Sequence, residues 1–303
     1  MTIKRMGVLA HPTRPQTAPV AERIAETLRR AGLEVCVYTR WTEADVRNTI
    51  CQMEMVVAIG GDGAMLHAAR VCAPSNVPVL GLNMGYLGFL TEIRDPETWD
   101  EHLNAVLAGH YWIEQRMMVR VEAWRDGDGS LRPLASSDAL NDVVISRGTL
   151  TRTIRLDTYI DREWTSTYNA DALIIATATG STAYALASGG PILPPELRNI
   201  LIVPVAPHLS LDRPIVLPEG AKVEVIVAPD QQEEIVLSAD GTLLCSLRPD
   251  DRVLVQASEH VSKFVRLRSR NYFYRSLLDR LEPRMPAPRK PGRRLPPPNT
   301  DEG

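Results

Sequence analysis

Four short, valine-rich apolar runs in the first third of the chain limit the possible folds more than any other feature. They occupy residues 6–10, 33–38, 55–59 and 77–82. Runs of this length without regular polar residues are typical of strands that are buried on both faces. Segments with helical periodicity accompany them, at residues 15–30, after Gly63 and at residues 96–107. This alternation of strands and helices predicts a parallel sheet covered by helices.

The pattern changes near residue 115. Beyond it, apolar and polar residues alternate in short runs at 119–124, 154–160, 223–227 and 253–255, with turn residues at 126–129 and 218–220. Alternation of this kind indicates strands with one buried face. We therefore predict an α/β domain over residues 1–115 and a mostly β domain over residues 116–270. A closing helix or arm is expected at 271–282, and a disordered tail rich in proline and arginine at 283–303.

Composition and charge exclude several classes of function. The formal net charge of the 303 residues is −3, so no whole-protein field favours nucleic acid or an anionic membrane. The longest apolar run, residues 172–178, is far shorter than the roughly 20 residues of a membrane-spanning helix, and no signal peptide is apparent. The four cysteines are far apart, without histidines at ligand spacing, which favours reduced thiols over disulfides or a zinc site. We expect a cytoplasmic protein that binds neither nucleic acid nor membranes.

A glycine-rich turn, Gly60-Gly61-Asp62-Gly63, follows the third apolar run. Glycines around one carboxylate allow the backbone to approach a ligand closely, and the N-terminus of the following helix offers unpaired N–H groups to an anion. Ligands of such sheets bind at the carboxyl ends of the strands. The turn is therefore a candidate phosphate site with Asp62 at its centre. The alternative is a plain turn in which Asp62 caps the helix.

Three other segments place glycine or polar residues beside apolar strands. Residues 81–90 (GLNMGYLGFL) follow the fourth run, Asn141 and Asp142 precede an apolar run, and a Thr-Gly-Ser-Thr turn at 179–182 follows another. Two glycine-rich turns at adjacent strand ends would form a crevice. The hydroxyls and amides of the Thr-Gly-Ser-Thr turn can hydrogen-bond a base, a ribose or a phosphate. By itself, the Asn-Asp pair is more often a turn or a cap than a site.

In these segments the sequence resembles the NAD kinase family. The matching motifs are Gly-Gly-Asp-Gly at 60–63, Asn-x-Gly-x-Leu-Gly-Phe-Leu at 83–90, an Asn-Glu pair that reads Asn-Asp at 141–142, Thr-Gly-Ser-Thr-Ala-Tyr at 179–184, Gly-Gly-Pro-Ile at 189–192, a Pro-His…Arg-Pro-Ile-Val segment at 207–216 and Asp-Gly at 240–241. They stand in the family's order and spacing, and the resemblance covers about residues 4–280. Lipid kinases and phosphofructokinases share only the first of these motifs.

The resemblance implies a nucleotide-binding α/β domain followed by a β-sandwich. It also implies an enzyme that transfers the γ-phosphoryl group of ATP, bound with a divalent ion (Mg²⁺ expected), to the 2′-hydroxyl of the adenosine ribose of NAD; polyphosphate as donor stays open. A hydroxyl is a weak nucleophile, so Asp62 is expected to accept its proton. Alignment and charge neutralisation would supply most of the catalysis. No direct side-chain ligand of the metal is predicted, and a homodimer or homotetramer is expected from the family.

The resemblance also implies the residues that bind substrate. Asn141 and Asp142 would hold hydroxyl or amide groups of NAD, and Asp171 resembles a carboxylate that often contacts NAD from a neighbouring subunit. For the phosphate loop the set is Gly60, Gly61 and Gly63, and for NAD it is Asp62, Gly63, His67, Phe89, Asn141, Asp142, Arg152, Asn169, Asp171, Thr182, Ala183, Tyr184, Ala187 and Thr242. For His67, His208 and Tyr184, a purely structural role is the alternative.

Four departures from the family pattern bear on catalysis. Ala64 stands where threonine or asparagine is common, Asp142 is one methylene shorter than glutamate, and Asn169-Ala-Asp171-Ala replaces Arg-(Gly/Ser)-Asp-Gly, so that a cation is missing. The usual Ser-Ala before Gly-Gly-Pro is transposed at 187–188. These departures motivate one alternative, a catalytically weak, NAD-binding regulatory paralogue. The other alternative is a different Gly-Gly-Asp-Gly kinase that acts on a lipid or a sugar. NAD kinase is the preferred interpretation.

Overall fold

The computed structural model describes residues 3–85, 88–127, 130–148, 152–231, 234–274 and 277. The chain forms two units, Met1–Ser269 and Arg270–Gly303, and every strand and helix named below belongs to the first. In the second unit, residues 272–274 are helical. Most of the arm predicted at 271–282, and the whole tail predicted at 283–303, lie outside the described residues.

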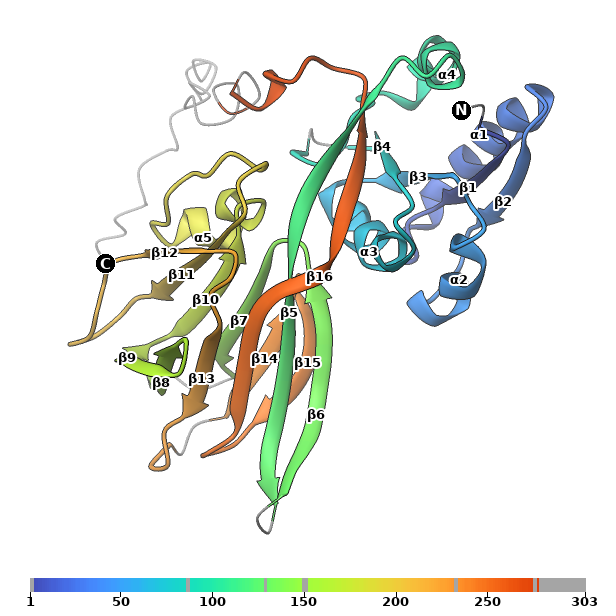
Figure 1. Cartoon of the computed structure of the whole chain (residues 1–303). Coiled ribbons are helices and arrows are strands. Elements are labelled where there is room, and N and C mark those ends of the chain that lie inside the picture. Colours follow the sequence, from blue (N-terminus) through green and yellow to red (C-terminus); the bar gives the residue numbers. More distant parts are fainter. Residues whose placement is uncertain are drawn as a thin grey trace, which may run out of the picture. The chain divides into compact units, whose positions relative to one another are not determined.

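The four apolar runs form parallel strands in the order β2-β1-β3-β4, as the sequence predicts (Figure 1). Their bounds are β1 (Arg5–Leu9), β2 (Glu34–Tyr38), β3 (Met55–Gly60) and β4 (Val79–Asn83). Strands β3 and β4 are buried along their whole length, whereas β2 at the edge is partly exposed. Because these strands are parallel, the residues that follow Leu9, Gly60 and Asn83 emerge at the same edge of the sheet.

Helices cover both faces of this parallel region. On one face α1 (Ala18–Arg30) and α4 (Trp99–Leu107) share a core with alternate residues of β1 and β3, and on the other α2 (Glu43–Ile50) and α3 (Asp62–Cys72) do so. Short 3₁₀ turns, Pro15–Thr17 and Pro96–Thr98, lead into α1 and α4. The sequence analysis missed α2, although Thr42 and Asp45 form a capping box at its start, which is a local signal for a helix.

The rest of the first unit forms two largely antiparallel layers. One layer continues the parallel strands through β16, in the order β2-β1-β3-β4-β16-β13-β8-β9, with β5 beside β16 and β6 beside β5; the other has the order β12-β11-β10-β7-β14-β15. The bounds are β5 (Trp112–Gly127), β6 (Ser130–Ala139), β7 (Asp142–Arg147), β8 (Ile154–Ile160), β9 (Glu163–Ala170), β10 (Ala172–Thr177), β11 (Asn199–Val205), β12 (Ile215–Pro218), β13 (Val223–Val227), β14 (Ile235–Ala239), β15 (Thr242–Leu247) and β16 (Arg252–Arg266).

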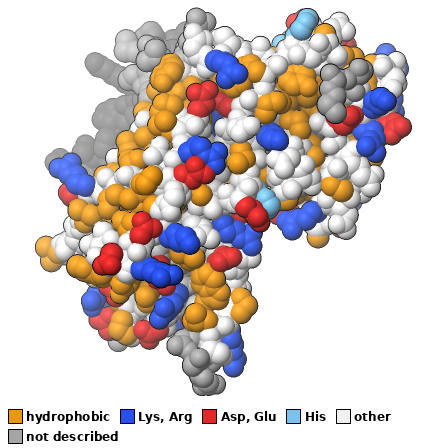
Figure 2. Space-filling model, in the orientation of Figure 1, with side chains coloured by type: hydrophobic (Ala, Val, Ile, Leu, Met, Phe, Trp, Pro, Cys, Tyr) orange, Lys and Arg blue, Asp and Glu red, His pale blue; other side chains and the backbone are white. Residues whose placement is uncertain are grey.

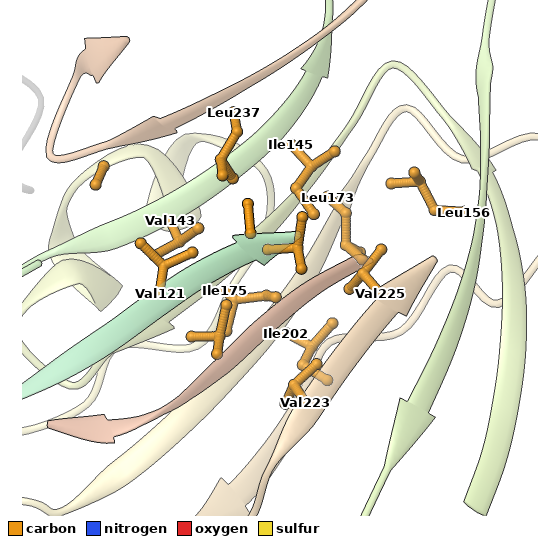
Figure 3. Close-up of a cluster of buried hydrophobic side chains, with 14 of the residues drawn as sticks. Val121, Val143, Ile145, Leu156, Leu173, Ile175, Ile202, Val223, Val225 and Leu237 are labelled. Carbon is orange, nitrogen blue, oxygen red and sulfur yellow. The ribbon is translucent and has the colours of Figure 1, made fainter. Parts of the chain in front are cut away.

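One apolar core fills the space between these two layers (Figure 3). Val121 and Val225 enter it from one layer, and Ile145, Leu173 and Leu237 from the other. Alternate residues of β10 and β11 face away from this core and pack with α5 (Tyr184–Ala187) in a smaller cluster. Two sheets that share their inner faces form a β-sandwich, so the predicted fold class is confirmed.

The long strands β5 and β16 belong to both regions (Figure 1). Val119, Val121 and Val253 lie in the sandwich core, whereas Phe264 near the end of β16 lies in a core of the parallel region. Phe264 also pairs with Val79 of β4. The two regions are therefore joined by continuous strands, and the predicted boundary at residue 115 stays a prediction.

The hydropathy and the charge distribution of the described residues bear on whether the chain has membrane-spanning helices or patches of one charge. No helix among them is long and apolar enough to cross a membrane. On the face shown in Figure 2, positive and negative side chains are interspersed.

Candidate active site

The Gly60–Gly63 turn lies between β3 and α3. Gly60 ends β3 with φ +149°, and a Cβ at this residue would lie 2.7 Å from the Cβ of Ala64, so both the backbone and the available space favour glycine. Gly61 is the N-cap of α3, and no side chain caps the first turn. The N-terminus of α3 can therefore offer its N–H groups to an anion.

Asp62 is the first residue of α3, and backbone amides hold its carboxylate. The Phe89 N–H donates to Oδ2 at 2.7 Å, and the Leu90 N–H donates to Oδ1 at 2.9 Å. The loop approaches this closely because residue 88 is glycine: a Cβ there would lie 1.8 Å from Asp62 Oδ1. Asp62 is half-buried, and each of its oxygens keeps a second acceptor position. Asp62 thus orients toward the 83–90 motif and is not the helix cap that the sequence left as an alternative.

A pocket of about 230 Å³ lies at this edge of the sheet and is lined by residues that follow β1, β3 and β4. The lining residues are His11, Arg14, Gly61, Asp62, Gly63, Ala64, Asn83, Met84 and Gly85. The sequence analysis missed His11 and Arg14 as site residues. The available signal was that the loop with His11 and Arg14 follows the parallel strand β1, just as the Gly60–Gly63 turn follows the parallel strand β3.

His11 is held in one orientation at this pocket. The Thr13 N–H donates to His11 Nδ1 at 3.2 Å, so in the neutral ring the proton lies on Nε2. Burial lowers the pKa of His11, and the positive charge of Arg14 lowers it further. The lowered pKa favours the neutral imidazole, and among the residues that line this pocket Arg14 is the cation.

The second part of the site lies at one end of the sandwich, where Asp240 holds the turn before β7. The buried Asp240 carboxylate accepts from the N–H groups of Leu140 at 2.9 Å, Asn141 at 2.7 Å and Asp142 at 3.3 Å. Burial raises the pKa of Asp240, although these amides and Arg70 act in the opposite direction. Burial, and then the charge of Asp240, raises the pKa of Asp142 to about 7. Two buried carboxylates thus adjoin here, and one of them titrates near neutral pH.

The Thr-Gly-Ser-Thr turn packs directly against Asn141. The Thr177 N–H donates to the Asn141 carbonyl at 2.8 Å, and a Cβ on Gly180 would lie 2.0 Å from that same oxygen. Residues Gly180–Thr182 form a 3₁₀ turn, in which the Thr182 hydroxyl donates to the Thr179 carbonyl at 3.2 Å. Tyr184 begins α5 and is 45% exposed. The predicted residues 141–142 and 179–184 are therefore brought together.

Arg70 of α3 connects the two parts of the site. Its Nε donates to Glu43 of α2 at 2.8 Å, and its Nη1 lies 3.9 Å from the Asp240 carboxylate. Its Nη2 donates to His67 Nδ1 at 2.9 Å and reaches the Thr242 hydroxyl at 3.5 Å. Two predicted residues, His67 and Thr242, therefore contact the same buried guanidinium.

A buried network of charged residues, which the sequence did not predict, makes a second connection. Arg266 is wholly buried; its Nη1 donates to the Leu90 carbonyl at 2.8 Å and its Nε to Glu114 at 2.8 Å. Glu114 also accepts from Arg116 Nε at 3.0 Å, and Arg116 Nη1 reaches the Thr179 hydroxyl at 3.5 Å. These contacts lead from the loop that holds Asp62 to the Thr-Gly-Ser-Thr turn.

Some predicted residues lie elsewhere in the chain. Asp171 precedes β10 and pairs with Arg147 at 3.1 Å, at the end of β7 opposite Asp142, and a strand of this length spans about 16 Å. The Asn169 carbonyl accepts from the His208 N–H at 2.7 Å in the same area. Arg152 is exposed. Ala187 is also exposed, but it ends α5, the helix that Tyr184 begins. Arg147 thus supplies a cation beside Asp171, where Asn169 departs from the family pattern.

Comparisons with known proteins agree in both regions of the chain. Residues 6–111 match the ATP-NAD kinase N-terminal domain, and residues 140–267 match the ATP-NAD kinase C-terminal domain. The chain is 37% identical over 279 residues to the NAD kinase of Chloroflexus aurantiacus, covering 92% of this chain and 99% of the relative. It is 39% identical over 252 residues to the NAD kinase of Pseudomonas fluorescens, covering 83% and 81% of the two chains.

Two solved structures share the fold. An NAD kinase from Archaeoglobus fulgidus in complex with ATP is similar with a TM-score of 0.67 and 26% identity, over 90% of this chain and 97% of the other. Yeast NADH kinase complexed with NADH is similar with a TM-score of 0.78 and 24% identity, over 93% and 88% of the two chains. The latter similarity shows the fold alone.

Proposed function

The chain belongs to the NAD kinase family, and from this premise we propose that it phosphorylates the adenosine ribose 2′-hydroxyl of NAD with ATP, with Asp62 as general base. The observation that carries the role of Asp62 is its fixed carboxylate. Amides of Phe89 and Leu90 hold both oxygens, and the group lines the pocket at the N-terminus of α3. A carboxylate held in this way keeps a free lone pair for a hydroxyl proton.

The proposed step transfers one proton and one phosphoryl group. The ribose hydroxyl gives its proton to Asp62, its oxygen forms a bond to the γ-phosphorus, and the bond from that phosphorus to the bridging oxygen breaks to release ADP. The N–H groups at the start of α3 and the Arg14 guanidinium would receive the phosphate oxygens. A divalent ion, with Mg²⁺ expected, would neutralise charge on the transferring group.

We assign NAD to the second part of the site. Asn141, Asp142 and the turn at 179–184 form one surface there, linked to α3 through Arg70, and Phe89 is adjacent to Asp62 through its own N–H. Asp171, Asn169 and Arg152 fit this proposal as residues that complete the NAD site of a neighbouring copy, in a homodimer or homotetramer. Ala187 ends the helix that Tyr184 begins and is assigned with it to the same NAD site. A cytoplasmic location belongs to the same proposal.

The two alternatives fare differently. A lipid or sugar kinase would share only the Gly-Gly-Asp-Gly turn, whereas the family match continues over residues 140–267, so this alternative has no support. The regulatory paralogue shares the whole match and is separated only by an activity measurement.

We expect Asp62→Asn to reduce NADP formation from NAD, ATP and Mg²⁺ by about 10²- to 10⁴-fold, because the amide cannot accept the proton. NAD binding, measured by calorimetry, and the circular dichroism spectrum should be retained. The matched control is Asp100→Asn, which changes an exposed carboxylate on α4. Unchanged turnover in Asp62→Asn would exclude Asp62 as the base. An unmutated protein that binds NAD saturably but forms no NADP would support the regulatory paralogue.

A further inference from the structure

Asn83 is one of the residues that line the pocket beside Asp62, and one of the two polar atoms of its side chain is unpaired within the described part of the chain. Asn83 ends β4 and is 2% exposed. Its Nδ2 donates to the Gly85 carbonyl at 2.7 Å, which identifies the nitrogen end of the amide. Its Oδ1 is buried and accepts no hydrogen bond from any residue that the structure describes. An unsatisfied buried acceptor costs about 1–3 kcal/mol. We therefore expect a hydrogen-bond donor or a cation from outside the chain to contact this atom.

The pocket around Asn83 limits what that partner can be. Asn83 pairs with Gly60 across β3 and β4, next to the turn and the helix N-terminus that favour an anion. A phosphate oxygen has no proton to give to Oδ1, so an anion alone leaves Asn83 unpaired. A divalent cation bound to that anion satisfies both, because a carbonyl oxygen is one of the hard ligands that Mg²⁺ prefers.

The other residues of the pocket fit a metal ion that takes most of its ligands from a bound anion and from water. Among the described residues, no group of three or more His, Cys, Asp or Glu side chains could hold a metal ion. Mg²⁺ commonly has one or two protein ligands and completes its shell with substrate phosphates and water. Asp62 is the carboxylate that lines this pocket, and the proposed function assigns it to the proton of the hydroxyl. Asn83 is therefore the side chain best suited to the ion.

We propose that Asn83 Oδ1 is a ligand of the divalent ion that accompanies the phosphoryl donor, with donor phosphate oxygens and water as the other ligands. This inference rests on the proposed function for the identity of the donor. It also replaces the expectation from sequence that no side chain ligates the metal.

The test measures binding, so it does not depend on turnover. Mn²⁺ serves as the probe, and its complex with a non-hydrolysable ATP analogue is titrated into the unmutated protein, Asn83→Ala and Asn83→Asp, with electron paramagnetic resonance as the readout. The same analogue is titrated without metal, in the presence of EDTA, by calorimetry. Asn104→Ala, which changes an exposed asparagine on α4, is the matched control.

We expect Asn83→Ala to weaken binding of the Mn²⁺ complex at least about 10-fold and to leave binding of the metal-free analogue within about twofold of the control. Asn83→Asp, which keeps an oxygen and adds charge, should bind the Mn²⁺ complex at least as tightly as the unmutated protein. If Asn83→Ala does not fold, the aspartate variant decides the question alone.

Three results would overturn the proposal: equal weakening with and without metal in Asn83→Ala, no weakening in that variant, or loss of the Mn²⁺ complex in Asn83→Asp. The first of these would assign Oδ1 to a hydroxyl of the nucleotide or of NAD. A protein that binds the Mn²⁺ complex through Asn83 but forms no NADP would instead contradict the proposed function and leave this inference standing.

Discussion

The two halves of the site hold their carboxylates in opposite ways. The glycine half comprises the turn at 60–64 and the described residues of the 83–90 motif, and the carboxylate half comprises residues 141–142, 177–184 and 240–242. In the glycine half, Asp62 is half-buried and is held by two backbone N–H groups. In the carboxylate half, Asp240 is buried beside Asp142, and the pKa of each is raised.

This difference indicates which chemical role each half of the site is suited to. Neutral backbone dipoles at the edge of a sheet orient a carboxylate at little cost and leave it able to accept a proton. Burial and a neighbouring negative charge both disfavour an ionised carboxylate, so the pKa of Asp240 is raised and that of Asp142 is raised to about 7. The glycine half is therefore suited to proton transfer, and the carboxylate half to building a shaped surface that responds to pH.

The largest expected effect concerns Arg266, which connects the two halves. Arg266→Met leaves the buried Glu114 without one of its cations and removes the donor to the Leu90 carbonyl. We expect a loss of about 3–5 kcal/mol in the free energy of unfolding, measured by urea denaturation, because the partner charge stays buried.

Arg23→Met is the control for this prediction, because Arg23 makes a two-pronged ion pair with Glu97 on the surface. It should cost no more than about 1 kcal/mol. Equal, small losses in both variants would show that the two halves are stabilised independently. Arg266 would then make no energetic connection between them.

The second effect concerns Asp142 and pH. In the unfolded chain Asp142 ionises near 3.8, whereas in the folded chain it keeps its proton to about pH 7. Between these two pH values the folded state binds more protons than the unfolded state. The contribution of Asp142 to the free energy of unfolding therefore falls as pH rises from about 4 to about 7 and is then constant. The full difference corresponds to at most about 4 kcal/mol.

Asp142→Asn cannot ionise, so we expect its stability to depend less on pH between 4 and 8 and to exceed that of the unmutated protein at pH 8. Chemical denaturation at several pH values measures this. Glu97→Gln, at an exposed position, should leave the pH dependence as it is. Parallel pH profiles of Asp142→Asn and the unmutated protein would refute the distinction between the two halves.

The smallest effect tests the glycine half. Gly88→Ala places a Cβ 1.8 Å from Asp62 Oδ1, so the carboxylate or the loop must shift. We expect kcat to fall about 10- to 100-fold, since displacements of about 1 Å have such effects, with a smaller change in stability than in Arg266→Met. Gly220→Ala, where a Cβ would meet no atom within 4 Å, is the control. A normal kcat in Gly88→Ala would show that the position of Asp62 is not critical.

The fold could be predicted to the extent that its signals are local. The apolar runs that became β1, β3 and β4 and the alternating runs that became β8 and β13 were found from periodicity alone. Helix α2 was missed because its apolar face is short, with Val46 and Ile50 as its buried residues. Its capping box was the signal to use.

The site divides in the same way. Asp62 stands in a glycine-rich turn after a buried strand, so residue type and spacing singled it out as a candidate, whereas Asn141 was singled out by the family resemblance. His11 was missed because no motif surrounds it. Arg266 was missed because an arginine in an alternating strand is typically an exposed residue, whereas this one is wholly buried.

The sequence by itself determined the parallel sheet, the sandwich, the glycine-rich turn and the family, because each depends on residues close together in the chain. The tertiary structure alone decided that Arg70 meets Asp240 and that Arg266 meets Leu90. It also decided that Asn83 has an unpaired oxygen beside Asp62. These features join residues up to 176 positions apart, and their energies depend on burial. Burial and long-range contact arise only when the whole chain packs, and no local pattern of residues encodes them.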